Sequence, residues 1–178
     1  MTGLMRTLTA AAFGWTTAWA WAGEASTGAT AGTGPGAAGG TAAATAHYTG
    51  DGPGVARTRT RTGDVNIARG VAWGVDQNGL DFSFSHAIAP RFGPSYAGTF
   101  NLSIGRDGAV AGSYGGSVAD GGLGRTVQAG GTTRSAPWGG TSAVANAGGT
   151  TVGGGRVEAR TNSWNRPAFQ MTRGRFIR

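Results

Sequence analysis

Residues 65–90 read VNIARGVAWGVDQNGLDFSFSHAIAP, and this stretch decides the fold class. Large apolar side chains alternate with small or polar ones on both sides of its centre. This alternation is typical of a half-buried β-strand, because successive side chains of a strand point to opposite faces. Between the two runs stands Asp76-Gln77-Asn78-Gly79, and Asn-Gly is the strongest short signal for a hairpin turn. The sequence therefore predicts an antiparallel hairpin whose apolar face, with His86 on it, packs into the core.

The same pattern continues towards the C-terminus. A proline-containing loop at residues 90–94 is followed by alternating Phe100, Leu102 and Ile104, and Gly105-Arg106-Asp107-Gly108 supplies a second turn. No window of comparable length has the spacing of an amphipathic helix. We therefore expect residues 64–118 to form the hairpin core of an all-β domain that extends over residues 64–178.

Glycine-rich blocks follow this core. Residues 121–156 divide into four blocks of nine, GGLGRTVQA, GGTTRSAPW, GGTSAVANA and GGTTVGGGR. One interpretation is an antiparallel meander in which Gly-Gly pairs close the turns, as part of a sandwich or a small barrel. The alternative is a parallel β-solenoid or β-roll built from nine-residue repeats. No carboxylate occurs between residues 121 and 157, so a roll of the calcium-binding type would lack its ligands.

The N-terminal third of the chain predicts export and a spacer. Residues 1–22 contain Arg6, an apolar stretch and a small-residue site, Ala20-Trp21-Ala22, as in a cleavable signal peptide. We expect a periplasmic, cell-surface or extracellular protein with no transmembrane span in the mature chain. Residues 23–63 are Gly, Ala or Thr at 30 of 41 positions, which predicts a flexible spacer because little apolar surface is available to offset the ordering entropy.

Composition and charge narrow the function classes. Gly supplies 36 of the 178 residues, Cys is absent, and the net charge of +7 comes from Arg alone because the chain has no Lys. Disulfides, cysteine–metal sites and a phosphate-binding P-loop are therefore excluded. A basic exported protein is expected to meet acidic glycans or anionic surfaces rather than nucleic acid.

Candidate functional residues are few. No arrangement of nucleophile, base and acid occurs in a suitable context, so we expect no enzyme activity, no cofactor and no metal site. Trp138 and Trp164 fall in predicted connections, where indole rings stack on sugars or anchor partners, and Arg173 and Arg175 offer contacts to polyanions. These features indicate an exported, non-catalytic structural or surface protein, such as a matrix, filament or adhesion component capable of self-assembly. The alternatives are a monomeric secreted domain that binds a glycan or small ligand and, with less support, an outer-membrane β-barrel.

Overall fold

The computed structural model describes residues 23–34, 40–136 and 140–168, which form ten β-strands. The strands are β1 (Gly23–Thr33), β2 (Gly40–Thr49), β3 (Gly54–Arg61), β4 (Val65–Asp76), β5 (Gly79–Pro90), β6 (Ser95–Gly105), β7 (Val110–Asp120), β8 (Gly124–Ala136), β9 (Gly140–Val152) and β10 (Arg156–Arg166). Nothing within the described ranges is a helix that is long and apolar enough to cross a membrane.

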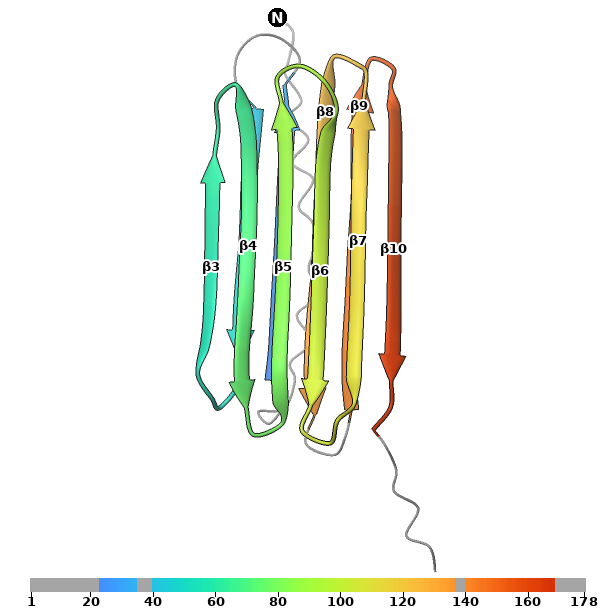
Figure 1. The fold of residues 1–178 in the computed structure, drawn as a ribbon. Helices are drawn as coiled ribbons and strands as arrows, with labels where there is room; N and C mark the ends of the chain where they lie inside the picture. The colour runs from blue at the N-terminus through green and yellow to red at the C-terminus, as the bar shows by residue number, and fades with distance from the viewer. Residues whose placement is uncertain (1–22, 35–39, 137–139, 169–178) are drawn as a thin grey trace, which may run out of the picture.

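Two antiparallel sheets lie face to face. The four-stranded sheet has the order β2-β1-β8-β9, and the six-stranded sheet has the order β10-β7-β6-β5-β4-β3. In Figure 1, β2, β1, β8 and β9 lie behind β4, β5, β6 and β7 in that order, whereas β3 and β10 flank the covered part. The axes of neighbouring strands are closely aligned and show little twist, so both sheets are flat (Figure 1). The antiparallel prediction is therefore confirmed as a sandwich of two separate sheets, and the parallel solenoid alternative is wrong.

Both predicted turns of the hairpin core are present. Asp76 ends β4, and its Oδ1 accepts hydrogen bonds from the backbone N–H groups of Asn78 (2.7 Å) and Gly79 (3.1 Å). Gly108 closes the turn between β6 and β7 with a φ of +83°, a left-handed conformation that favours glycine. Turn chemistry therefore fixes the register of β4 with β5 and of β6 with β7.

Two of the Gly-Gly pairs that begin the nine-residue blocks have a different role from the one predicted. Gly121 and Gly122 do form a turn, with φ values of +76° and +74°. However, Gly130-Gly131 lies within β8 and Gly148-Gly149 lies within β9, so the nine-residue period does not correspond to one strand and one turn. The reason is packing between the sheets, because a side chain at Gly131 would overlap the carboxamide of Asn101 on the opposite sheet.

Residues 23–63, for which composition predicts a spacer, contain β1, β2 and β3. Strand β1 lies inside the four-stranded sheet and is hydrogen-bonded to both β2 and β8. Its alternate residues, from Ala25 to Ala31, are buried against the other sheet. Large side chains are unnecessary here, since paired main-chain groups and closely packed small side chains stabilise the segment.

The interior between the sheets is made of small residues. Its apolar cluster consists of alanines and Val127, and buried serines, threonines and Asn101 fill the remaining positions. The large apolar residues of β4 and β5 lie on the opposite, outer face of the six-stranded sheet, so the prediction that this face and His86 form the core is wrong. Trp73 remains 39% exposed and Phe100 43% exposed. The large side chains lie outside because the two sheets are too close together to hold them. At Gly70, for example, an added side chain would start 2.5 Å from the carbonyl oxygen of Thr45 in β2.

Candidate binding face

The outer face of the six-stranded sheet is the main candidate for a functional surface. We call it the aromatic face. It consists of the outward residues of β3 to β7 and β10, which the strand register arranges in rows across the sheet. Its partly or largely exposed aromatic residues are Trp73, Phe82, Phe84, Tyr96, Phe100, Tyr114 and Trp164. Contiguous exposed apolar surface of this kind usually marks a site of interaction.

Two neighbouring rows carry most of the rings. In one row, Trp73, Phe82 and Leu102 are paired across β4, β5 and β6. In the next row, Phe84 of β5 pairs with Phe100 of β6, and Phe100 pairs with Tyr114 of β7. The rings of Phe82 and Phe100 approach to 6.2 Å between centroids in a tilted arrangement. Cross-strand contacts of this type hold side chains in place, so the face offers a preformed set of rings.

A row of basic and small residues crosses the aromatic face. We call it the basic row, and in order from β3 to β10 it contains Arg59, Arg69, His86, Gly98, Gly116 and Arg160. Gly98 and Gly116, at the centre of the row, lack side chains, and the His86 ring lies over Gly98. Cations therefore stand towards both ends of the row, and the rings of Phe84, Phe100 and Tyr114 line one of its sides.

His86 lies in this row in a partly buried position. Its ring stacks on Phe84 at 5.6 Å between centroids, and a side chain added at Gly98 would start 2.7 Å from Cε1 of His86. Nδ1 is buried and has no hydrogen-bond partner among the described residues. Burial lowers the pKa of His86, and the nearby Arg69 cation lowers it further. The imidazole is therefore neutral at pH 7, and the charge of the row comes from its arginines.

A pH effect on stability follows from His86. Because its pKa is lowered by folding, the unfolded chain binds more protons as the pH falls below the ordinary value of 6.5. The stability that neutral His86 contributes is present above that pH and is lost on acidification. We expect the melting temperature to fall less between pH 7.5 and 5.5 in His86→Phe than in the wild type, measured by circular dichroism. Identical pH profiles for the two proteins would contradict this assignment.

The structure places one of the four predicted binding residues. Trp164 lies on β10 rather than in a connection, is 46% exposed, and its indole covers Gly112 of β7, so it joins the aromatic face. Trp138, Arg173 and Arg175 lie outside the described residues. The residues missed by sequence reasoning are Trp73, Tyr96, Phe100, Tyr114 and the arginines of the basic row. Alternation shows that the large residues share a face, and the small size of the residues between them is the signal that identifies the inner face.

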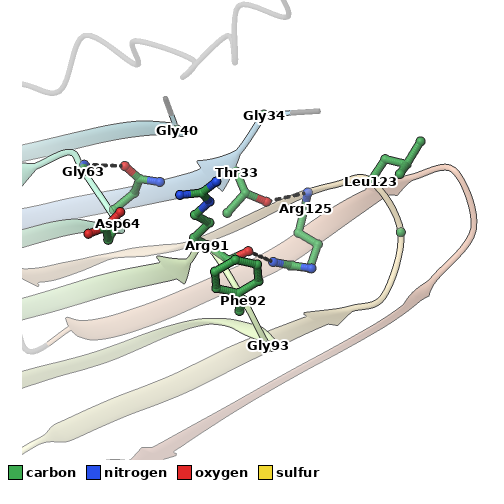
Figure 2. Close-up of a pocket in the computed structure, with 12 residues that line it drawn as sticks. Thr33, Gly34, Gly40, Gly63, Asp64, Arg91, Phe92, Gly93, Leu123 and Arg125 are labelled. Atoms are coloured by element: carbon green, nitrogen blue, oxygen red, sulfur yellow. Dashed lines mark hydrogen bonds between the residues drawn. The ribbon is translucent and has the colours of Figure 1, made fainter. Parts of the chain in front are cut away.

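A second candidate is a pocket of about 680 Å³ at one end of the sandwich. Figure 2 shows Arg91, Phe92 and Arg125 around it. One nitrogen of the Arg125 guanidinium donates to the carbonyl oxygens of Pro90 (3.2 Å) and Arg91 (3.1 Å), and the backbone N–H of Arg125 donates to Thr33 Oγ1 (3.1 Å). The Arg91 guanidinium lies 5.3 Å from the centroid of the Phe92 ring. Arg125 therefore serves the fold by joining the two sheets, and the flat face remains the better candidate for ligand binding.

Neither metal chemistry nor resemblance adds a function to these surfaces. Among the described residues, no three His, Asp or Glu side chains gather closely enough to hold a metal ion. Function must therefore be inferred from the chemistry of the aromatic face. Comparisons with models of protein families, with curated proteins and with solved structures give no match to this chain.

Proposed function

We propose that the protein is an exported, non-catalytic surface protein that adheres to an extended acidic polysaccharide through the aromatic face. The observation that carries this proposal is the combination of two neighbouring aromatic rows with a basic row beside them. The face presents aromatic rings, arginines and one neutral imidazole, and these groups bind a ligand by stacking and by hydrogen bonds. The predicted signal peptide supports export, and an exported basic protein meets acidic glycans more often than nucleic acid.

The two parts of the face match the two parts of such a ligand. The apolar sides of sugar rings stack on aromatic rings, and Arg guanidinium groups form charge-assisted hydrogen bonds with carboxylate or sulfate groups. Arg59 and Arg160 stand on the two edge strands, five strand spacings apart, which is roughly 24 Å. This span suits a chain of several sugars rather than a single small molecule.

Assembly of copies is the second candidate function. It is favoured by the flat sheets in Figure 1 and by β3 and β10, each of which is hydrogen-bonded on one side only within the described residues. The charge of these edges opposes it. Strand β3 carries Arg57, Arg59 and Arg61. Strand β10 carries three arginines and one glutamate, Arg156, Arg160, Arg166 and Glu158, so two six-stranded sheets meeting edge to edge would bring an excess of like charge together. Adhesion is therefore the function that the geometry supports better, and light scattering over a wide concentration range separates the two.

Charge reversal on the aromatic face tests the adhesion proposal. We expect the wild type to bind alginate, a polyuronate, and not neutral dextran. The double variant Arg59→Glu/Arg69→Glu should bind alginate at least about 30-fold more weakly, because two exposed charge contacts of about 1 kcal/mol each together amount to about 2 kcal/mol. Tyr114→Ala should also weaken binding by removing one stacking ring, without changing the charge. Affinities are measured by calorimetry at fixed salt, because salt screens these contacts.

The control reverses the same number of charges elsewhere. Arg106 lies in the turn between β6 and β7, and Arg134 is exposed on β8 in the other sheet. Arg106→Glu/Arg134→Glu has the same net charge as the test variant and should change the affinity by less than about threefold if screening limits distant charges. Equal losses in both double variants, or no binding of alginate by the wild type, would refute adhesion through this face.

A further inference from the structure

The first residue of β1 lies against a buried carboxylate group. Asp81, on the inner side of β5, is 1% exposed. Its Oδ2 accepts a 2.6 Å hydrogen bond from Ser135 Oγ, whereas its Oδ1 has no partner among the described residues. Burial raises the pKa of Asp81 because the charged form loses its hydration. Without a cation, a carboxyl group buried in this way either stays charged at a cost in stability or takes up a proton.

Further acidic and polar groups gather at the same place. Asp76 uses Oδ1 for the turn that follows β4, which leaves its Oδ2 directed at the start of β1. The hydroxyl of Tyr48 is buried without a hydrogen-bond partner, and its pKa is raised by burial and then by Asp76, Asp81 and Asp51. The ion pair found in the described part of the chain joins Arg156 and Glu158 and does not involve this cluster. Negative charge is thus concentrated here without a described cation.

Gly23 supplies the geometry for a cation. A side chain added at Gly23 would start 2.6 Å from Asp76 Oδ2, 2.7 Å from Asp81 Oδ2 and 3.0 Å from Ser135 Oγ. If Gly23 were the first residue, a rotation of about 120° around its Cα–C bond would bring its nitrogen to this position, since the substituents of a tetrahedral carbon are spaced by that angle. The three N–H donors of an ammonium group would then face three oxygen atoms at hydrogen-bond distance.

We infer that removal of residues 1–22 creates an α-ammonium group at Gly23 that pairs with Asp76 and Asp81, so that processing completes the fold. This inference rests on the export part of the proposed function. A signal endopeptidase would add water across the Ala22–Gly23 peptide bond. Ala22 would keep a carboxylate, and the amine released on Gly23 would take up a proton. At Gly23 the space beside the two carboxylates holds no side chain, so it is open to the ammonium group.

The absence of lysine makes the inference testable on one polypeptide. The full 178-residue chain is secreted from a bacterial host, and the mass of the released protein gives its first residue. An amine-selective acetylating reagent then modifies the α-amino group alone, because the chain has no Lys side chain that could also react. If secretion yields no protein, a fusion cut directly before Gly23 supplies the same N-terminus, so failure of export is distinguished from failure of the ion pair.

The Asp81→Asn substitution should have opposite effects in the two forms. In the free-amine protein it removes one partner of the ion pair and should lower the melting temperature by about 5 °C. In the acetylated protein it removes an uncompensated buried charge and should leave the melting temperature unchanged or raise it. Acetylation alone should lower the melting temperature of the wild type by a similar amount and should have little effect on Asp81→Asn. The folded wild type should also be acetylated more slowly than the variant.

Three results would overturn the inference. The first is a released protein whose N-terminus is not Gly23. The second is an equal effect of Asp81→Asn on the acetylated and the free-amine proteins. The third is that calcium chloride restores the melting temperature of the acetylated wild type but not that of acetylated Asp81→Asn, which would assign the carboxylates to a metal cation instead of the amine.

Discussion

Asn101→Leu is expected to destabilise the protein by about 4 kcal/mol or more, enough to prevent folding at 37 °C. Asn101 is fully buried between the sheets. Its Oδ1 accepts a 2.6 Å hydrogen bond from Ser83 Oγ, and its Nδ2 donates to Ser113 Oγ (3.1 Å) and to the carbonyl oxygen of Val144 (3.2 Å). One carboxamide therefore connects β6 to its two neighbours and to β9 across the interior. Leucine has a similar size but would remove the bonds to Ser113 Oγ and to the carbonyl oxygen of Val144, and would leave Ser83 Oγ with Thr27 and Gly131 alone.

Chemical denaturation followed by circular dichroism measures this effect. Asn162→Leu is the matched control, because Asn162 is exposed on β10 and its side chain contacts only the hydroxyl of Tyr114 (3.3 Å) among the bonds described. The control should change the free energy of unfolding by less than about 1 kcal/mol. If Asn101→Leu were as stable as Asn162→Leu, the buried polar network would not be what joins the two sheets.

The local structure of the hairpin core could be predicted from the sequence, but the side that is buried could not be predicted from alternation alone. A period of two shows which residues share a face, and both turns were found from their residue types. The period of two does not show which of the two faces is buried. The decision lies in the residues between the large ones, such as Ala68, Gly70 and Ala72, which match the small inward residues of the other sheet. The face of the six-stranded sheet that is buried is therefore determined by the matching sizes of side chains on strands far apart in the sequence.

The prediction of a flexible spacer at residues 23–63, which rests on composition, is wrong for a related reason. A segment of Gly, Ala and Thr was expected to stay flexible because it has little apolar surface. In the structure, β1 gains hydrogen bonds from β2 and β8 on both sides, and β8 is about a hundred residues away in the sequence. Pairing over such a distance leaves no local signal.

The candidate site was only partly predictable for the same reason. That the large side chains of β4, β5 and β6 share one face followed from alternation. The basic row did not, because Arg59, Arg69 and Arg160 come together only through the pairing of β3 with β4 and of β10 with β7. The sequence predicts a connection at Trp164, whereas in the structure Trp164 lies in β10 and its indole covers Gly112 on the aromatic face.

Close spacing of the sheets leads to the second large prediction, which compares two glycines of the six-stranded sheet. Gly70 of β4 points inward, and even a methyl group there would lie 2.5 Å from the carbonyl oxygen of Thr45 and 3.3 Å from Thr27 Cβ. The contact with Thr45 involves backbone, which cannot rotate away as a side chain can. We therefore expect Gly70→Ala to destabilise the protein and Gly70→Val to cost about 3 kcal/mol or more by forcing the sheets apart.

Gly116 of β7 provides the comparison, because it points outward and an added methyl group would meet only the carbonyl oxygen of Ala97, at 3.4 Å. Gly116→Val should be neutral or slightly stabilising, since valine suits an extended strand better than glycine does. Both substitutions add the same atoms to the middle of a strand, so the difference between their free energies of unfolding isolates the spacing of the sheets. Equal destabilisation by the two valines would mean that the interior is loose enough to accept a large side chain. In that case the small inner residues would no longer explain why the aromatic rings lie outside.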